Sequence, residues 1–207
     1  MIDLENEISQ YFKVINSALD DFELYKGILS NIKGNEKKIN QINGFLYTIL
    51  NSLKYSFVMK TAKLVDERED KNIFKLINCC ENQQNQFLTE FIDEFDNEDT
   101  KTTEKVFIKK VNVLDDINNF KLNLNNYKTQ IENIKAQRDK IYAHSDKKYF
   151  YDGSKINEDF KVTYNDIDEI LNLIYKNLNI LSTDYNRRVY SKFPTTLDEY
   201  LHIIEKI

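Results

Sequence analysis

Residues 103–146 read TEKVFIKKVNVLDDINNFKLNLNNYKTQIENIKAQRDKIYAHSD and hold the longest candidate helix of the chain. Apolar side chains recur at intervals of three and four residues, the period of one face of an α-helix. This stripe consists of Val106, Val113, Ile117, Phe120, Leu124, Tyr127, Ile131, Ile134 and Ile141, with Lys110 filling the one wide interval. Arg138 falls on the same stripe. We therefore predict a helix over residues 103–142 with an arginine on its apolar face.

An arginine on an apolar face needs a partner, because a buried guanidinium without one loses its hydration at a large cost. Arg138 must therefore meet a carboxylate, a phosphate or a water-filled cleft. Asp66, at the end of another predicted helix, could pair with it. An exposed charge at a helix end is the plainer interpretation of Asp66.

The other segments show similar periods. A regular heptad predicts a helix over residues 1–34, whose seam faces another helix either in this chain, which we favour, or in a partner. Its seam residues are Leu4, Ile8, Tyr11, Ile15, Ala18, Phe22, Tyr25, Leu29 and Ile32. Further helices are expected over residues 36–66, 73–80 and 87–95, followed by a polar loop at 96–102.

The last sixty residues contain two helix starts. Residues 154–162 are expected to be extended or to form a small hairpin. Thr163, with Asp166 three positions later, predicts a capping box at the start of a long helix. Thr196 with Glu199 predicts a short C-terminal helix.

The predicted fold is all-α, an elongated antiparallel helical bundle with an additional N-terminal helix and a short C-terminal helix. With 207 residues, four glycines and one proline, the chain is expected to form one domain over residues 1–207. It divides into the heptad helix at 1–34, a bundle at 35–190 and the short helix at 195–207.

Composition excludes several classes of function. The net charge of −5 argues against a general nucleic-acid coat, which would be basic over a broad face. Two adjacent cysteines and two histidines make no zinc pattern, and we expect no metal and no cofactor. No apolar run approaches the roughly 20 residues that cross a bilayer, and the N-terminus does not resemble a signal peptide. A cytoplasmic protein is expected.

Arg138 precedes His144 by six positions, and together they could cleave RNA without a metal, since arginine binds phosphate and histidine transfers protons near neutral pH. On a straight helix these positions are roughly 240° apart and cannot share a face. Either the helix ends or bends near Ala143, or a second copy of the chain completes the site.

Arg138, Asp139 and Lys140, followed by Ala143, His144 and Asp146 near the end of a long helix, resemble the AbiU-like HEPN domains. HEPN domains carry an arginine, then a polar residue, here Asp139, and a histidine after four to six intervening positions. The resemblance is close over residues 138–146 and looser over 47–181. It implies a homodimer that brings two Arg138/His144 pairs into one cleft. It also implies a metal-independent endoribonuclease of a phage-defence or toxin system, restrained by an antitoxin or another regulatory protein.

In that interpretation His144 is the general acid or base, and Arg138 stabilises the charge that develops on phosphorus. Asp139 either orients Arg138 or His144, or is simply solvated, and Asp146 has the same two interpretations. Residues expected to contact RNA are Lys140, Tyr142, Lys147 and Lys148. Two other functions remain open: a non-catalytic helical interaction module of HEPN fold, and a nucleotide-binding domain without cleavage.

Overall fold

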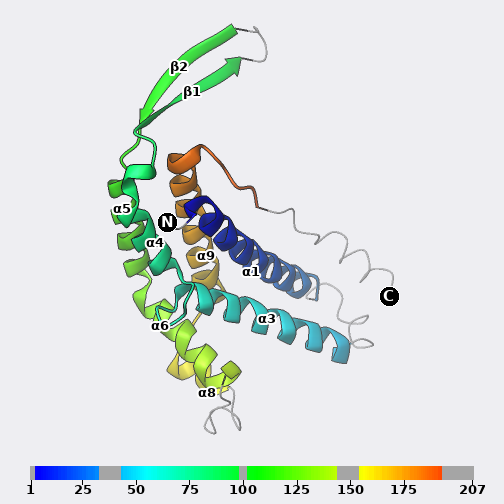
Figure 1. Cartoon of the computed structure of the whole chain (residues 1–207). Coiled ribbons are helices and arrows are strands. Elements are labelled where there is room, and N and C mark those ends of the chain that lie inside the picture. The colour runs from blue at the N-terminus through cyan, green and yellow to red at the C-terminus, as the bar shows by residue number, and fades with distance from the viewer. Residues whose placement is uncertain (1–2, 33–42, 98–101, 144–153, 193–207) are drawn as a thin grey trace.

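The computed structural model describes residues 3–32, 43–97, 102–143 and 154–192, which form a bundle of helices with one projecting hairpin (Figure 1). The elements are α1 (Leu4–Ile32), α3 (Asn43–Val65), α4 (Ile73–Asn82), η1 (Gln84–Gln86), β1 (Glu90–Asn97), β2 (Thr102–Lys110), α5 (Val113–Asn126), α6 (Lys128–Gln137), the π-helical turn η2 (Arg138–Ala143), α8 (Ser154–Asp159) and α9 (Tyr164–Asn186). The predicted class, a helical bundle, is confirmed.

The seam of α1 packs within the chain, against α3 and α9. Its residues from Leu4 to Tyr25 are buried at every seam position. Phe22 lies edge-on to Phe57 of α3 with ring centroids 5.2 Å apart, and Phe12 packs edge-on to Tyr175 of α9 at 5.6 Å. Burial of each such side chain contributes about 1.5–3 kcal/mol. The preference for packing within the chain is thus confirmed.

The helix α9 begins as predicted. The Thr163 hydroxyl accepts a hydrogen bond from the backbone N–H of Asp166, and the Asp166 carboxylate accepts one from the backbone N–H of Thr163. The helix ends at Asn186, and Arg187 takes a left-handed conformation with φ of 62°. That conformation ends the helix without a glycine.

Two segments predicted as helical form a β-hairpin, so the expected helix over residues 87–95 and the expected helical start over 103–110 are wrong. Strands β1 and β2 are antiparallel, with Glu90 opposite Lys110 and Ile92 opposite Ile108. Both runs are rich in aromatic and β-branched residues, which favour strands. The hairpin extends away from the helices (Figure 1). Its base is fixed where the Leu88 N–H donates to the Asp184 carbonyl at 2.9 Å.

The remaining long helix is interrupted as well. The helix α5 ends at Asn126 and α6 restarts at Lys128, after Tyr127 with φ of −101° and ψ of 16°. The break follows Asn125 and Asn126, whose residue type is a poor helix former because its side chain competes for backbone hydrogen bonds. Residues 154–159, expected to be extended or to form a small hairpin, form the helix α8.

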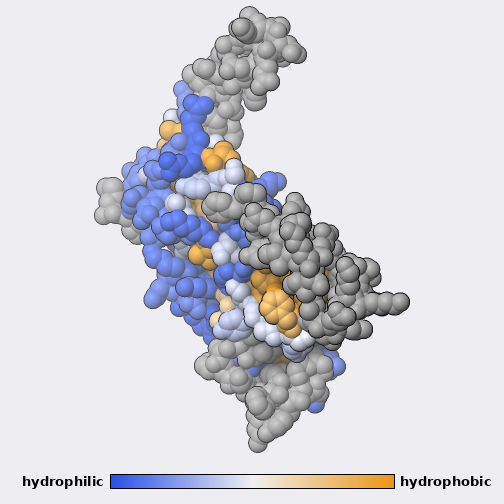
Figure 2. Space-filling view, turned by 90° about the vertical axis from the view of Figure 1, so that its right-hand side faces the viewer, coloured by the Kyte–Doolittle hydropathy of each residue, from blue (hydrophilic) through white to orange (hydrophobic). Residues whose placement is uncertain are grey.

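Two other predictions fall outside the described residues: the first part of the helix expected over 36–66 and the C-terminal helix at 195–207. None of the described helices combines the length and the apolar character that crossing a membrane requires. The described surface in Figure 2 is mostly hydrophilic, with separate hydrophobic patches. Some apolar side chains of α3 are exposed, among them Phe45 at 60% and Tyr47 at 67%.

Candidate functional site

The turn between α3 and α4 is built around Asn72, which is fully buried. Its side-chain oxygen caps α4 by accepting from the Lys75 N–H at 3.0 Å, and its amide nitrogen donates to the Glu67 and Glu69 carbonyls. The Tyr11 hydroxyl of α1 donates to the Asn72 carbonyl at 2.8 Å. Burial is the main cause that raises the pKa of Tyr11 to about 12, so this hydroxyl stays a donor. The turn is therefore held at a fixed position on the bundle.

This turn presents acidic side chains to Arg138, whose side chain is 10% exposed. Its Nη2 donates to Asp66 Oδ2 at 2.5 Å, its Nη1 to Glu69 Oε1 at 2.9 Å, and its Nε to Asp139 Oδ1 at 2.9 Å. All three guanidinium nitrogens thus have a carboxylate partner. Of the three expected surroundings for Arg138, a carboxylate, a phosphate or a water-filled cleft, the structure shows carboxylates.

Arg68 joins the same group from the outside. It donates from Nε and Nη2 to Asp66, at 3.0 and 2.7 Å, and from Nη2 to Asp139 Oδ2 at 2.7 Å. We call Asp66, Arg68, Glu69, Arg138 and Asp139 the arginine–carboxylate cluster. It contains two of the four arginines of the chain.

The two aspartates of the cluster are held in the ionised form. Hydrogen bonds from Arg68, the backbone N–H included, and from Arg138 outweigh burial and set the pKa of Asp66 well below its ordinary value. Burial acts in the opposite direction on Asp139 as well, but hydrogen bonds from the same two arginines lower its pKa. Neither aspartate can then accept a proton near neutral pH. Their chemistry is to position the guanidinium groups.

The sequence placed some of these residues well and missed others. Asp66 is fully buried and pairs with Arg138, so its interpretation as an exposed helix-end charge was wrong. Asp139 contacts Arg138, as one of its two predicted duties requires. Arg68 and Glu69 were not predicted as site residues. The scarcity of arginine was the one signal that could have drawn attention to Arg68.

The backbone departs from the α-helix at Arg138. The helix α6 ends at Gln137 and a π-helical turn runs to Ala143. The departure thus begins at Arg138, earlier than the end or bend near Ala143 that was one of two expected alternatives. Such turns are rare and are often found at functional sites. Beside the start of this turn, the Gln137 amide donates to the Phe160 carbonyl at 2.8 Å, and Asn133 donates to Lys161 at 2.9 Å. The segment that precedes α9 is thereby tied to α6.

Several predicted site residues are not among those that the structure describes. His144, Asp146, Lys147 and Lys148 lie outside the described residues, as does the side chain of Tyr142. Lys140 is described and is half-buried.

Comparison with known proteins places the chain in a protein family. The family model of AbiU2, a family of HEPN proteins, covers residues 1–206 of the chain. Neither a curated protein nor a solved structure matches the chain.

Proposed function

Because this chain belongs to the AbiU2 family of HEPN proteins, we propose that it is a metal-independent endoribonuclease of an abortive-infection or toxin system. In the reaction, the ribose 2′-oxygen attacks the adjacent phosphorus while its proton passes to a base. The bond from phosphorus to the 5′-oxygen breaks, and that oxygen takes up a proton. The products are a 2′,3′-cyclic phosphate end and a 5′-hydroxyl end.

The observation that carries the proposal is the way in which Arg138 is held. Buried Asp66 fixes Nη2, while the partner of Nη1, Glu69, has a side chain that is 37% exposed. A phosphate can replace a half-exposed carboxylate at a guanidinium, because each presents two oxygens that accept hydrogen bonds from a pair of N–H groups. Arg138 would then stabilise the negative charge on the phosphorane.

His144 supplies the proton transfer in this proposal, as general base or general acid. Arg138 begins the π-helical turn that ends at Ala143, directly before His144. Two copies of the chain would bring two Arg138/His144 pairs into one cleft, with Lys140, Tyr142, Lys147 and Lys148 contacting RNA and Asp146 supporting His144. An antitoxin or another regulatory protein would restrain the activity.

The alternative is a non-catalytic interaction module, and one observation favours it. Each nitrogen of the Arg138 guanidinium already has a carboxylate partner. In that case the cluster serves only to join α3 to η2, and the bundle acts by binding another protein.

Cleavage of RNA in the presence of EDTA separates the two functions. We expect the wild type to cleave and to leave 2′,3′-cyclic phosphate ends, and His144→Ala to lose this activity by about two orders of magnitude or more. The only other histidine gives a matched control, and His202→Ala should cleave like the wild type. Equal cleavage by wild type and His144→Ala would contradict the proposal, and absence of cleavage by the wild type would favour the interaction module.

A further inference from the structure

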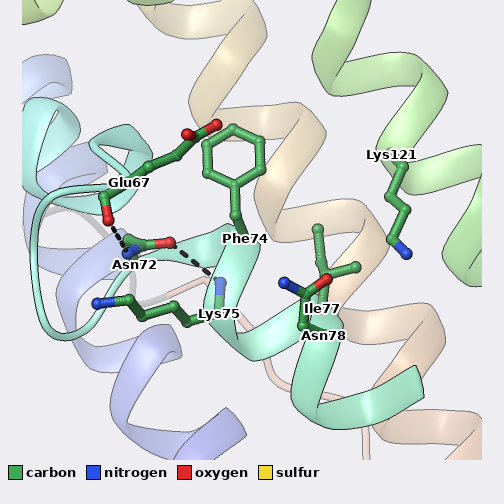
Figure 3. Close-up of a pocket in the computed structure, with 7 residues that line it drawn as sticks. All are labelled: Glu67, Asn72, Phe74, Lys75, Ile77, Asn78 and Lys121. Carbon is green, nitrogen blue, oxygen red and sulfur yellow. Dashed lines mark hydrogen bonds between the residues drawn. The ribbon is translucent and has the colours of Figure 1, made fainter. Parts of the chain in front are cut away.

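A concave site lies beside the turn between α3 and α4 (Figure 3). Its volume is about 410 Å³, within the range of small-molecule sites. It is lined by Glu67, Asn72, Phe74, Lys75, Ile77, Asn78 and Lys121. Glu67 comes from the turn and Lys121 from α5, so the pocket is bounded on both sides of α4 (Figure 3).

The pocket and the cluster share their framework. Asn72 donates to the Glu67 carbonyl, beside the pocket, and to the Glu69 carbonyl, whose own side chain binds Arg138. Lys75 Nζ donates to the same Glu69 carbonyl at 2.7 Å. The same turn residues therefore position both the pocket and the partner of Arg138.

The walls of the pocket suit a nucleotide. Phe74, whose ring is half-buried, and the buried side chain of Ile77 both line the pocket. Stacking of a base on an aromatic ring strengthens nucleotide binding, and it does so for all four bases. Lys121 is paired with Glu81 at 2.7 Å, but both side chains are more than a third exposed, so this ion pair is weak. The ammonium group can exchange that partner for a phosphate.

Two polar groups of the pocket are not engaged. Within the described part of the chain, the Glu67 carboxylate and the Asn78 side-chain amide make no hydrogen bond, and both residues are exposed. A carboxylate accepts two hydrogen bonds and donates none. Among the four bases of RNA, only guanine has two adjacent donors on one edge, N1–H and the N2 amino group. The Asn78 amide can both donate to and accept from the same base.

We propose that this pocket binds a guanosine nucleotide of the RNA, with the base stacked on Phe74, its N1–H and N2 amino group donating to Glu67, and its phosphate at Lys121. The inference rests on the proposed ribonuclease function and names the base that this enzyme prefers in its RNA.

The test uses the full-length wild type and mononucleotides, which contain no cleavable phosphodiester. Calorimetric titration with 5′-GMP, 5′-IMP and 5′-AMP measures each affinity. IMP keeps N1–H but lacks the N2 amino group, and AMP lacks both donors. We expect GMP to bind about tenfold more tightly than IMP, and AMP to bind no better than IMP.

Variants assign the preference to the pocket. Glu67→Gln should make GMP and IMP bind alike, and Phe74→Ala should weaken all three nucleotides by about fivefold or more. Glu23→Gln removes an acidic charge from an exposed pair on α1 and should bind like the wild type. Equal affinities in the wild type, no binding at millimolar nucleotide, or a GMP preference that survives Glu67→Gln would overturn the inference. Binding is read without cleavage, so this result and that of the His144→Ala experiment are independent.

Discussion

Arg138 and Arg68 bind the same two aspartates, yet they lie in different surroundings. The side chain of Arg138 is 10% exposed and that of Arg68 is 62% exposed. Arg138, the first residue of η2, donates to Asp66 directly after α3, and Arg68 binds the same two aspartates from the solvent side. Identical chemical groups therefore make nearly identical hydrogen bonds at two different depths.

The difference in burial between the two arginines should determine how much each contributes to the free energy of unfolding. A buried ion pair that loses one partner leaves a charge without hydration, which costs several kcal/mol. An exposed pair is solvated whether or not it forms, and it contributes little. The inner half of the cluster, Asp66 with Arg138, should therefore hold the structure, whereas the outer half, Arg68 with Glu69, should be exchangeable. A phosphate that binds Arg138 must displace Glu69, so the proposed function requires that Glu69 be exchangeable.

The largest expected effect is on Asp66, which is fully buried. Asp66→Asn keeps the shape but removes the charge that both arginines bind. We expect the free energy of unfolding to fall by about 3 kcal/mol, toward the lower end for a broken buried pair, because Arg138 keeps Glu69 and Asp139. Urea unfolding measures this loss. Glu67→Gln, one position later and exposed, is the control and should change stability by less than about 0.5 kcal/mol. Equal losses would show that depth does not matter here.

Low pH should destabilise the protein partly by protonating Asp66. The pKa of Asp66 is lowered in the folded protein by hydrogen bonds from Arg68 and Arg138. Its contribution to stability is therefore present above the unfolded value of about 3.9, and it is lost as pH falls toward the lower folded value. The slope approaches about 1.4 kcal/mol per pH unit for each proton taken up.

Unfolding of wild type and Asp66→Asn between pH 5 and pH 3 isolates that slope. The variant should lose less stability than the wild type over this range, because the titrating carboxyl is absent. Parallel pH profiles would assign the acid sensitivity to other carboxylates.

The inner half of the cluster was accessible to sequence reasoning, and the outer half was not. Arg138 interrupts a stripe of apolar residues, and the cost of burying a charge demands a partner whatever the fold. Arg68 and Glu69 are 70 and 69 positions away, in a turn shaped by the contact of Asn72 with Tyr11. No local period of the sequence encodes such a contact.

The helices and the hairpin differ in the same way. The period of α1 is sustained over 29 residues, so one interpretation fits it and the buried seam agrees. Each strand of the hairpin has only eight or nine residues. Short apolar runs fit a helix and a strand equally well, and the pairing of β1 with β2 decides between them. That pairing is a property of two segments together, which a scan of either one does not reveal.

The smallest expected effect is on Arg68. Arg68→Ala removes hydrogen bonds to Asp66 and Asp139, but its side chain is 62% exposed, and Arg138 remains as a partner for both aspartates. We expect a loss of less than about 1 kcal/mol in urea unfolding, diminishing further as salt screens the exposed charges. Arg138→Gln, measured under the same conditions, should cost several times more. Arg68→Ala could instead prove as costly as Arg138→Gln and insensitive to salt. The outer residues of the cluster would then be held as firmly as the inner ones, and a phosphate could not displace Glu69 from Arg138.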